Sequence, residues 1–295
     1  MTTTTAPTTR ATDEARDRAP AQRRRFRLDP GRMAAYVFLI VLAIIYIAPM
    51  VMLLLTSVKT LPEFNKSPVA MPTTLALENY VEAWNKANFP RYLFNTILYT
   101  VVSATIFVIT GTFLSVAIAR RFVRRSNWIF TLFLIALFLP PALIPQFQLI
   151  LRMGLYNNPI GYIMLFLVNP IGIVILVNYI ATIPRDLDEA AALEGCGYIR
   201  YVLQIVIPLA KPAIATVAVL HAIGVWNELV LATIYLTKAD YYPITRGLIV
   251  FNGIYGSNWP VIAAAVLMIA APMAVFFVFM QRYIIGGVTA GAVKG

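Results

Sequence analysis

The chain has 295 residues, of which 60% are hydrophobic and 13% are charged, about half the charged fraction typical of soluble domains, so its composition indicates an integral membrane protein. The formal net charge of +11 is not gathered on one folded face, which argues against a nucleic-acid-binding protein. The single cysteine excludes an intrachain disulfide, and one cysteine with one histidine argues against a zinc site of the usual Cys and His ligands.

The first 32 residues are rich in Thr, Ala, Arg and Pro, show no apolar periodicity, and carry eight of the 24 Lys and Arg residues. We interpret them as a disordered basic tail. Two roles stay open for this tail: a solvated leader that helps to set membrane orientation, and a lipid-binding or regulatory segment. The apolar run that begins at residue 33 is too long for the core of a signal peptide, so we expect it to remain as a membrane anchor.

Six long apolar segments follow the tail, and each exceeds the ~20 residues that cross a hydrocarbon core. Because backbone groups must be hydrogen-bonded internally in lipid, each segment should be helical. The sequence therefore predicts an all-α integral membrane protein with six transmembrane helices and one membrane domain over residues 33–295. The segments are residues 33–58, 92–119, 126–151, 153–184, 212–237 and 247–281.

The Lys and Arg residues between the segments predict the orientation of the chain. If the N-terminus is inside, inner segments carry 17 of these residues and outer segments carry 7. By the positive-inside rule, both termini and the loop at about residues 185–211 should lie in the cytoplasm. In the outer segment 59–91, residues 77–84 predict a short amphipathic helix along the membrane surface, with Tyr80 and Trp84 on one face.

The loop at about 185–211 begins with a pattern typical of a helix start. Asp186 can cap a helix, and Glu189, three residues on, completes a capping-box-like pair. Small residues at 190–192 let another surface approach closely. The pattern fits either a plain amphipathic connector or a docking surface.

The same loop continues with turn residues and a second helix. Gly195 and Gly197 supply backbone conformations that are closed to other residues. Residues 198–207 predict a second short helix with one apolar face, which Pro208 and Pro212 should end before the next span begins.

The spacing of this loop resembles the EAA loop of permease subunits in bacterial ABC importers, where that loop meets the ATPase. The resemblance implies that the ATPase-coupling residues are Glu189, Ala190, Ala191, Gly195, Ile205 and Pro208. Gly197 departs from the family pattern, in which Ser or Ala is more usual.

The resemblance covers about residues 33–295 and is closest to the second, six-span subunit of maltose-type carbohydrate importers. It is carried by Asn95–Thr96 in the second span, by Trp226–Asn227–Glu228 in the fifth, and by the C-terminal residues 281–295. Glu228 is the longer of the two acids found in that signature. The N-terminal tail is unusually long for the family, and the resemblance implies no role for it.

This resemblance implies a multi-pass protein of the bacterial plasma membrane that moves a sugar or oligosaccharide into the cytoplasm. The implied partners are a second permease subunit, two ATPase subunits and an external solute-binding protein. The sequence has no phosphate-binding GxxxxGK loop, so ATP and Mg are expected on the ATPase subunits, and we expect this chain to bind no cofactor and to be no enzyme.

Polar residues inside the predicted spans are candidates for the substrate pathway. Glu228 is the only acid in a span, and a charge at that depth costs at least ~2.5 kcal/mol, so it should meet a cavity or a partner. His221 lies seven residues earlier, on nearly the same helix face, and Trp226 can stack on a sugar ring. Solute contact and a structural hydrogen bond both stay open for Glu228. Asn227 and Asn178 complete the candidate set.

Prolines predict a further feature of the third span. Pro140, Pro141 and Pro145 should bend it near its outer end. Such breaks are common where helices line a pathway, and they also occur in ordinary packing.

Three other functions are compatible with the composition. One is an importer permease for another polar solute, such as an amino acid, a peptide or glycerol phosphate. Another is an ion-coupled secondary transporter, which usually shows internal repeats and several buried ionisable groups. A membrane enzyme would need a cluster of catalytic or metal-binding residues, and the sequence shows none.

Overall fold

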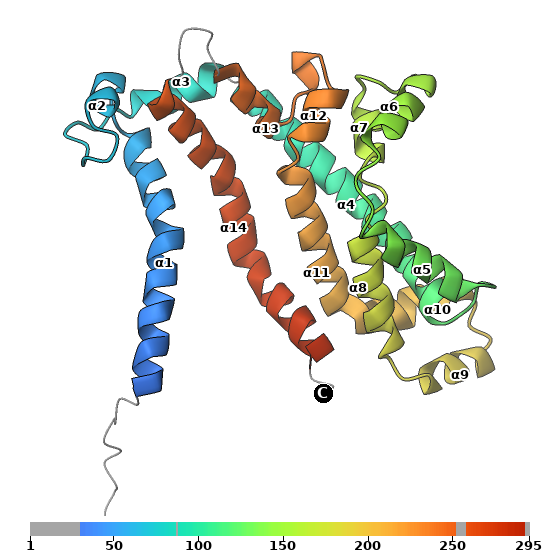
Figure 1. Cartoon of the computed structure of the whole chain (residues 1–295). Coiled ribbons are helices and arrows are strands. Elements are labelled where there is room, and N and C mark those ends of the chain that lie inside the picture. Colours follow the sequence, from blue (N-terminus) through green and yellow to red (C-terminus); the bar gives the residue numbers. More distant parts are fainter. Residues whose placement is uncertain (1–29, 87, 252–257, 293–295) are drawn as a thin grey trace, which may run out of the picture. The chain divides into compact units, whose positions relative to one another are not determined.

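The computed structural model describes residues 30–86, 88–251 and 258–292, and these residues form helices with no strand among them (Figure 1). Residues 1–29 of the predicted tail lie outside the described residues. The α-helices are α1 (Pro30–Ser57), α2 (Leu61–Lys66), α3 (Glu78–Lys86), α4 (Phe89–Ala119), α5 (Ser126–Ala136), α6 (Leu143–Arg152), α7 (Pro159–Met164), α8 (Pro170–Ala181), α9 (Asp186–Leu193), α10 (Tyr198–Tyr201), α11 (Ile207–Trp226), α12 (Val230–Tyr235), α13 (Ile244–Gly247) and α14 (Trp259–Ala292).

The chain divides into two compact units, residues 1–50 and residues 51–295. The described part of the first unit is most of α1, whose side chains are almost all exposed and apolar. The second unit holds every other helix.

Four described helical stretches are long and apolar enough to cross a membrane, and a bent pair, α8 with α9, makes a possible fifth. The four are 33–57, 89–119, 198–226 and 259–281. The third and fourth predicted segments are instead divided into shorter helices, α5 with α6 and α7 with α8. By length and composition the described residues therefore hold four or five candidate spans, and the number six stays a prediction.

The break in the third predicted segment has a clear cause. Helix α5 ends at Ala136, and α6 begins at Leu143, so Pro140 and Pro141 lie in the gap between them. Proline lacks the N–H that a helix interior needs and disfavours helical geometry at the residue before it. A break at Pro140 and Pro141 is confirmed, as an interruption several residues long. It lies near the middle of the predicted segment 126–151 rather than near its outer end, and Pro145 lies inside α6.

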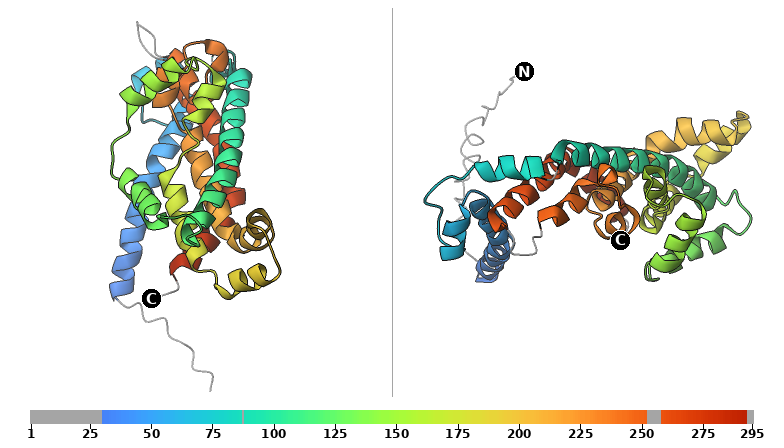
Figure 2. Two further views of the ribbon diagram at one scale, coloured as in Figure 1. Left: turned by 90° about the vertical axis from the view of Figure 1, so that its right-hand side faces the viewer. Right: turned by 90° about the horizontal axis from the view of Figure 1, so that it is seen from above.

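Helix α4 is central to the packing of the second unit, where it runs beside α8 and α11 (Figures 1 and 2). The largest buried cluster lies where these three helices meet, around Phe107, Leu176 and Val217. The contact is close because Gly172 faces the Phe107 ring, and a Cβ added there would lie 2.6 Å from that ring. Small residues permit such close helix crossings in membrane proteins.

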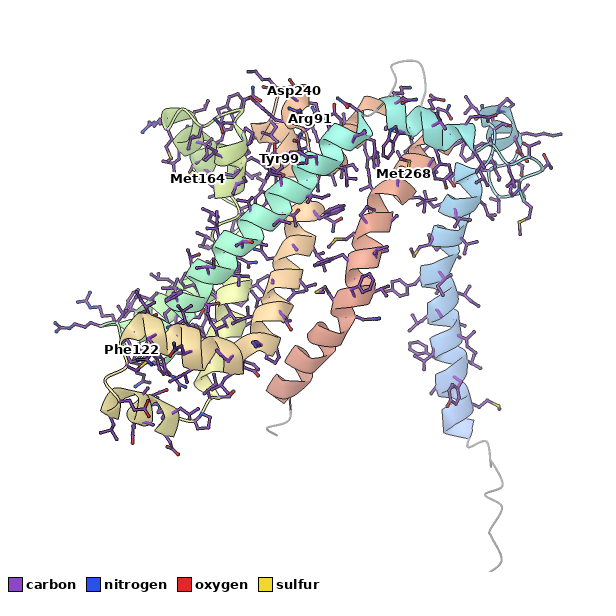
Figure 3. All side chains as sticks on the ribbon, turned by 180° about the vertical axis from the view of Figure 1, so that it is seen from behind. Arg91, Tyr99, Phe122, Met164, Asp240 and Met268 are labelled. Carbon is purple, nitrogen blue, oxygen red and sulfur yellow. The ribbon has the colours of Figure 1, made fainter. Side chains whose placement is uncertain are left out.

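One end of α4 is tied to the segment between α12 and α13. The side chain of Arg91 donates to the carbonyl of Asp240 at 3.2 Å, and the Tyr99 hydroxyl donates to the carbonyl of Tyr241 at 2.9 Å. Figure 3 shows Arg91, Tyr99 and Asp240 together at this end, whereas Phe122 lies beyond the opposite end of α4. Asn95 binds the same segment, with its amide 2.7 Å from the Asp240 carbonyl.

The short helix predicted at residues 77–84 is confirmed as α3. The Tyr80 hydroxyl lies 2.7 Å from the Ser57 hydroxyl, and the Trp84 ring stacks on Phe89 with 5.0 Å between the ring centroids. These contacts link α3 to the end of α1 and to the start of α4, and α3 also packs against α14.

Candidate functional site

Helix α9 carries the candidate coupling residues Glu189, Ala190 and Ala191. It is bent by 80° from α8, and Glu189 and Ala190 are exposed, whereas Ala191 is its only buried residue. The expectation that Asp186 caps this helix is wrong. The N-cap position is Arg185, without a side-chain hydrogen bond, and Asp186 already lies inside the helix.

Gly195 makes the turn that ends α9, as predicted. Its φ is +68°, in the left-handed region that favours glycine, and its N–H donates to the carbonyl of Ala192 at 3.1 Å. Gly197 has φ −69°, an ordinary value, so the expectation that it also needs to be glycine for the turn is wrong.

The second predicted helix begins where expected but does not stop at Pro208. Helix α10 passes through a π-helical turn, Val202–Val206, directly into α11, which contains Pro208 in its first turn and Pro212 in its interior. The N–H of Ile207 bonds to the carbonyl of Val202, five residues back. This wide turn accommodates the proline, which has no N–H of its own to place. Half-buried Ile205 packs against the main core cluster, and Pro208 is exposed.

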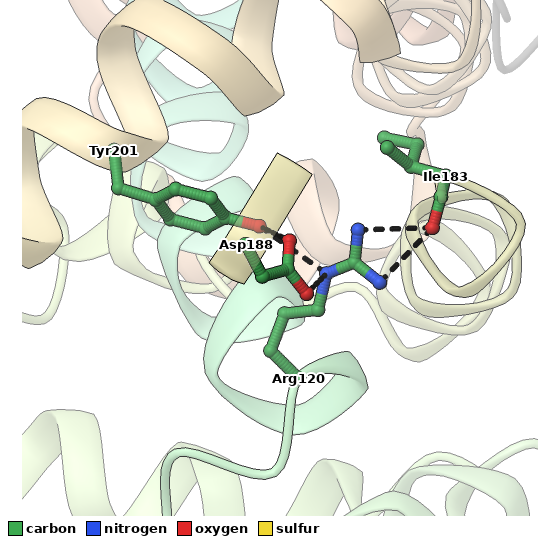
Figure 4. Close-up of polar contacts among 4 residues, drawn as sticks. All are labelled: Arg120, Ile183, Asp188 and Tyr201. Carbon is green, nitrogen blue, oxygen red and sulfur yellow. Dashed lines mark hydrogen bonds and ion pairs between the residues drawn. The ribbon is translucent and has the colours of Figure 1, made fainter. Parts of the chain in front are cut away.

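Arg120, at the end of α4, joins the start of this loop to its second helix (Figure 4). Its Nε lies 3.2 Å from Asp188 Oδ2 and donates to the Tyr201 hydroxyl at 3.3 Å. Both terminal nitrogens donate to the carbonyl of Ile183 at 3.1 Å. The Tyr201 hydroxyl also donates to Asp188. We call the side chains of Arg120, Asp188 and Tyr201, with the Ile183 carbonyl, the Arg120 clip.

Large apolar side chains are exposed on and beside α9. Leu193 is 90% exposed, Ile199 is 65% exposed, and Leu203 is also exposed. They lie on α9, on α10 and in the π-helical turn, close in sequence to the exposed carboxylate of Glu189. Exposed apolar side chains among polar ones are typical of surfaces that bind another protein.

Two of the pathway candidates share a cleft between α11 and the break that precedes α8. This cleft, of about 280 Å³, is lined by His221 and Glu228 together with Asn169. The Asn169 amide lies 3.2 Å from His221 Nδ1, while His221 Nε2 is buried without a hydrogen-bond partner among the described residues. The His221 ring stacks on Phe107 with 4.7 Å between centroids. We call this the Asn169 cleft.

The other candidates lie elsewhere. Trp226 lines a mainly apolar groove of about 660 Å³ between α4, α11 and α14, beside Thr100. The Trp226 Nε1 and the Thr100 hydroxyl have no hydrogen-bond partner among the described residues. Asn227 is exposed and donates back to the Ile223 carbonyl at 3.0 Å, and Asn178 is exposed on α8. The predicted pathway set therefore does not form one site.

Sequence reasoning missed Arg120 and Tyr201, and it left Asn169 out of the predicted pathway set. Arg120 was counted only as a positive charge, and nothing in the sequence identifies a partner 68 residues away. Asn169 had a local signal, because Asn before Pro often caps a helix, and its Oδ1 does accept from the Gly172 N–H at 3.1 Å. Among the described residues no three His, Cys, Asp or Glu side chains gather as metal ligands would.

Comparisons with known proteins agree with this architecture. A model of the family described as "binding-protein-dependent transport system inner membrane component" matches residues 111–288. The melibiose/raffinose/stachyose import permease protein MelC of Bacillus subtilis (strain 168) is 29% identical, with 86% of this chain and 94% of MelC covered. The diacetylchitobiose uptake system permease protein NgcG of Streptomyces coelicolor is 28% identical, with 88% of each chain covered.

A solved structure supports the fold. A chain from the crystal structure of a bacterial ABC transporter, involved in the import of the acidic polysaccharide alginate, superposes with a TM-score of 0.77. It is 22% identical and covers 85% of this chain and 95% of its own length. The likeness shows that both chains have the same fold.

Proposed function

The chain belongs to the family of binding-protein-dependent transport system inner membrane components, and we propose that it is the permease subunit of an importer for a sugar or oligosaccharide. It is a multi-pass protein of the bacterial plasma membrane. The named relatives import melibiose, raffinose, stachyose and diacetylchitobiose, which supports a carbohydrate as the substrate class.

The observation that carries this proposal is the exposure of α9. The helix presents Glu189, Ala190 and its last residue, Leu193, which are all exposed, and the left-handed Gly195 makes the turn that follows it. An ATPase that docks here would cover these side chains. Ile205 and Pro208, which complete the coupling set, lie in the π-helical turn and the first turn of α11.

The proposed assembly is the one that the family resemblance implies. The chain pairs with a second permease subunit, two ATPases bind from the cytoplasm, and a solute-binding protein delivers the sugar from outside. Six spans, with both termini and α9 in the cytoplasm, agree with the charge distribution along the chain. ATP and Mg bind the ATPases, and this chain binds no cofactor and hydrolyses nothing itself.

The Asn169 cleft is the proposed sugar-contacting region of this subunit. It brings together an imidazole, an amide and a carboxylate, which can exchange hydrogen bonds with hydroxyl groups. The apolar residues that make up most of the lining suit the faces of a sugar ring. Trp226 faces the other groove, so it is not expected to share a sugar with His221 and Glu228.

Co-purification of the ATPase tests the proposal. Glu189→Lys reverses the charge of an exposed residue without burying it, so the subunit should still insert in the membrane. We expect the ATPase to be lost from the purified complex and uptake to fall. Glu194→Lys, at another exposed acid just beyond α9, is the matched control and should retain more of the ATPase. Full assembly and uptake with Glu189→Lys would contradict docking at α9.

A further inference from the structure

We propose that the Arg120 clip passes the movement of α9 to α4, so that Arg120, Asp188 and Tyr201 are positioning residues that couple ATP hydrolysis to transport. The inference rests on the proposed function, in which the ATPase moves α9. It adds the route by which that movement reaches the helix that lines both the main core and the apolar groove.

The first support is how little else attaches α9. Ala191 is its only buried residue, and the helix projects beyond the ends of α8 and α10 (Figure 1). Beneath it lies a pocket of about 360 Å³, lined in part by Phe122, Ala192 and Cys196, so packing on that side is incomplete. A movement of α9 can therefore reach the rest of the protein only through the segments that precede and follow α9, through Ala191, or through Asp188.

The second support is that the clip joins four elements at one guanidinium. Arg120 belongs to the end of α4, Ile183 to the turn after α8, Asp188 to α9 and Tyr201 to α10. A guanidinium is a planar fork that can hold a carboxylate and a carbonyl at once. Because the two terminal nitrogens hold the Ile183 carbonyl while Nε holds Asp188 and Tyr201, a rotation of α9 cannot keep all the bonds unless α4 moves with it.

The third support is burial. The Arg120 side chain is 2% exposed and the Asp188 side chain 22% exposed. The other ion pair of the described residues, Lys86 with Glu82, is about half exposed on both sides. Exposed pairs of that kind contribute little to the stability of the fold, whereas separating a buried pair leaves an uncompensated charge inside the protein. The clip therefore resists opening during movement of α9.

The test uses the whole importer in proteoliposomes, with uptake and ATP hydrolysis measured on the same preparation. Arg120→Gln and Asp188→Asn each remove one charge of the pair and keep similar size. Arg124→Gln, an exposed arginine in the loop after α4, and Glu194→Gln are the matched controls. ATPase co-purification is measured for every variant, so that coupling is compared only in assembled complexes.

We expect sugar uptake per ATP hydrolysed to fall at least about fivefold in both clip variants, the lower end of couplings between distant sites. The ATPase should remain bound, and both controls should keep the wild-type ratio. The double variant should lose no more than either single one, because the two side chains act as one unit. A merely structural role would reduce the amount of complex without changing this ratio.

Two results would overturn the clip as a coupling link: a wild-type ratio in assembled Asp188→Asn complexes, or losses that multiply in the double variant. If Arg120→Gln prevents assembly, Arg120→Lys replaces it, since the ammonium can hold Asp188 but cannot fork to the Ile183 carbonyl. An unchanged ratio in that variant would count equally against the link. If the wild-type chain itself binds no ATPase, the proposed function fails instead.

Discussion

Trp226 and Glu228 are two residues apart, yet their side chains line different pockets. Trp226 belongs to the apolar groove between α4, α11 and α14, whereas Glu228 belongs to the Asn169 cleft. Helix α11 ends at Trp226, so Glu228 lies beyond its last residue. Glu228 Oε1 then accepts the N–H of Leu231 at 2.8 Å, and the Glu228 carbonyl accepts the Thr245 hydroxyl at 3.1 Å. Glu228 therefore makes hydrogen bonds that stabilise the fold and also lines the Asn169 cleft.

The bond to Leu231 leads to a prediction for Glu228 variants. Glu228→Ala removes the acceptor at the start of α12 and should destabilise the subunit by ~0.5–2 kcal/mol, the usual cost of losing a helix cap. Glu228→Gln keeps an acceptor oxygen and should cost less. Thermal unfolding and the yield of purified complex measure the difference. Equal, wild-type values for both variants would show that this bond contributes nothing.

Because the apolar groove and the Asn169 cleft are separate, a second prediction concerns which of them the sugar follows. His221→Phe preserves an aromatic ring against Phe107 but removes both ring nitrogens from the Asn169 cleft, so the KM for uptake should rise. Trp226→Phe removes an indole N–H that has no partner among the described residues, so uptake should stay close to wild type. The opposite pattern, with uptake impaired only by Trp226→Phe, would place the route along the apolar groove.

The sequence predicted the helical class, the short helix α3, the proline break and the turn at Gly195, because each depends on nearby residues. It could not predict the Arg120 clip, because Arg120 and Asp188 are far apart in the chain and their meeting depends on how α4, α8 and α9 pack. Proline was expected to end a helix at Pro208, and the π-helical turn overrides that rule. Seven-residue spacing correctly placed His221 and Glu228 at one cleft. The same periodicity of 3.6 residues per turn puts Trp226 on a different side of α11 from His221, which the predicted pathway set overlooked.

The two glycines of the loop should respond differently to the same change. Gly195→Ala forces a side chain into the left-handed region and should destabilise the loop by ~1–2 kcal/mol, with weaker binding of the ATPase. Gly197→Ala meets open space at an ordinary φ and should have little effect. Thermal unfolding and ATPase co-purification compare them, and equal losses would show that φ at Gly195 is not the cause.

The segment between α2 and α3 should depend on pH through Glu63. The backbone N–H of Thr73 donates to the Glu63 carboxylate and lowers the pKa of that carboxyl below its usual 4.5. Since the folded pKa is the lower one, the bond supports this segment fully above pH 4.5 and is lost as the pH falls through the folded value. Hydrogen exchange at Thr73, corrected for the intrinsic effect of pH, should show this loss.

Glu63→Gln is the control for that measurement. A glutamine cannot titrate, so the variant should show no step in Thr73 protection over the same pH range. A step of the same size in the variant would assign the pH dependence to another group.

The last prediction concerns orientation, on which docking at α9 depends. In a Cys196→Ser background, an impermeant thiol reagent added to intact cells should label Val69→Cys, which is highly exposed in the loop after α2. It should not label Leu193→Cys, which is more exposed still but lies on α9. Exposure therefore favours labelling at Leu193, and in cells that lack the ATPase, which would itself cover Leu193, only the position of α9 inside the cell can protect it. After permeabilisation both sites should react. Labelling of Leu193→Cys in intact cells would invert the orientation and remove α9 from the reach of a cytoplasmic ATPase.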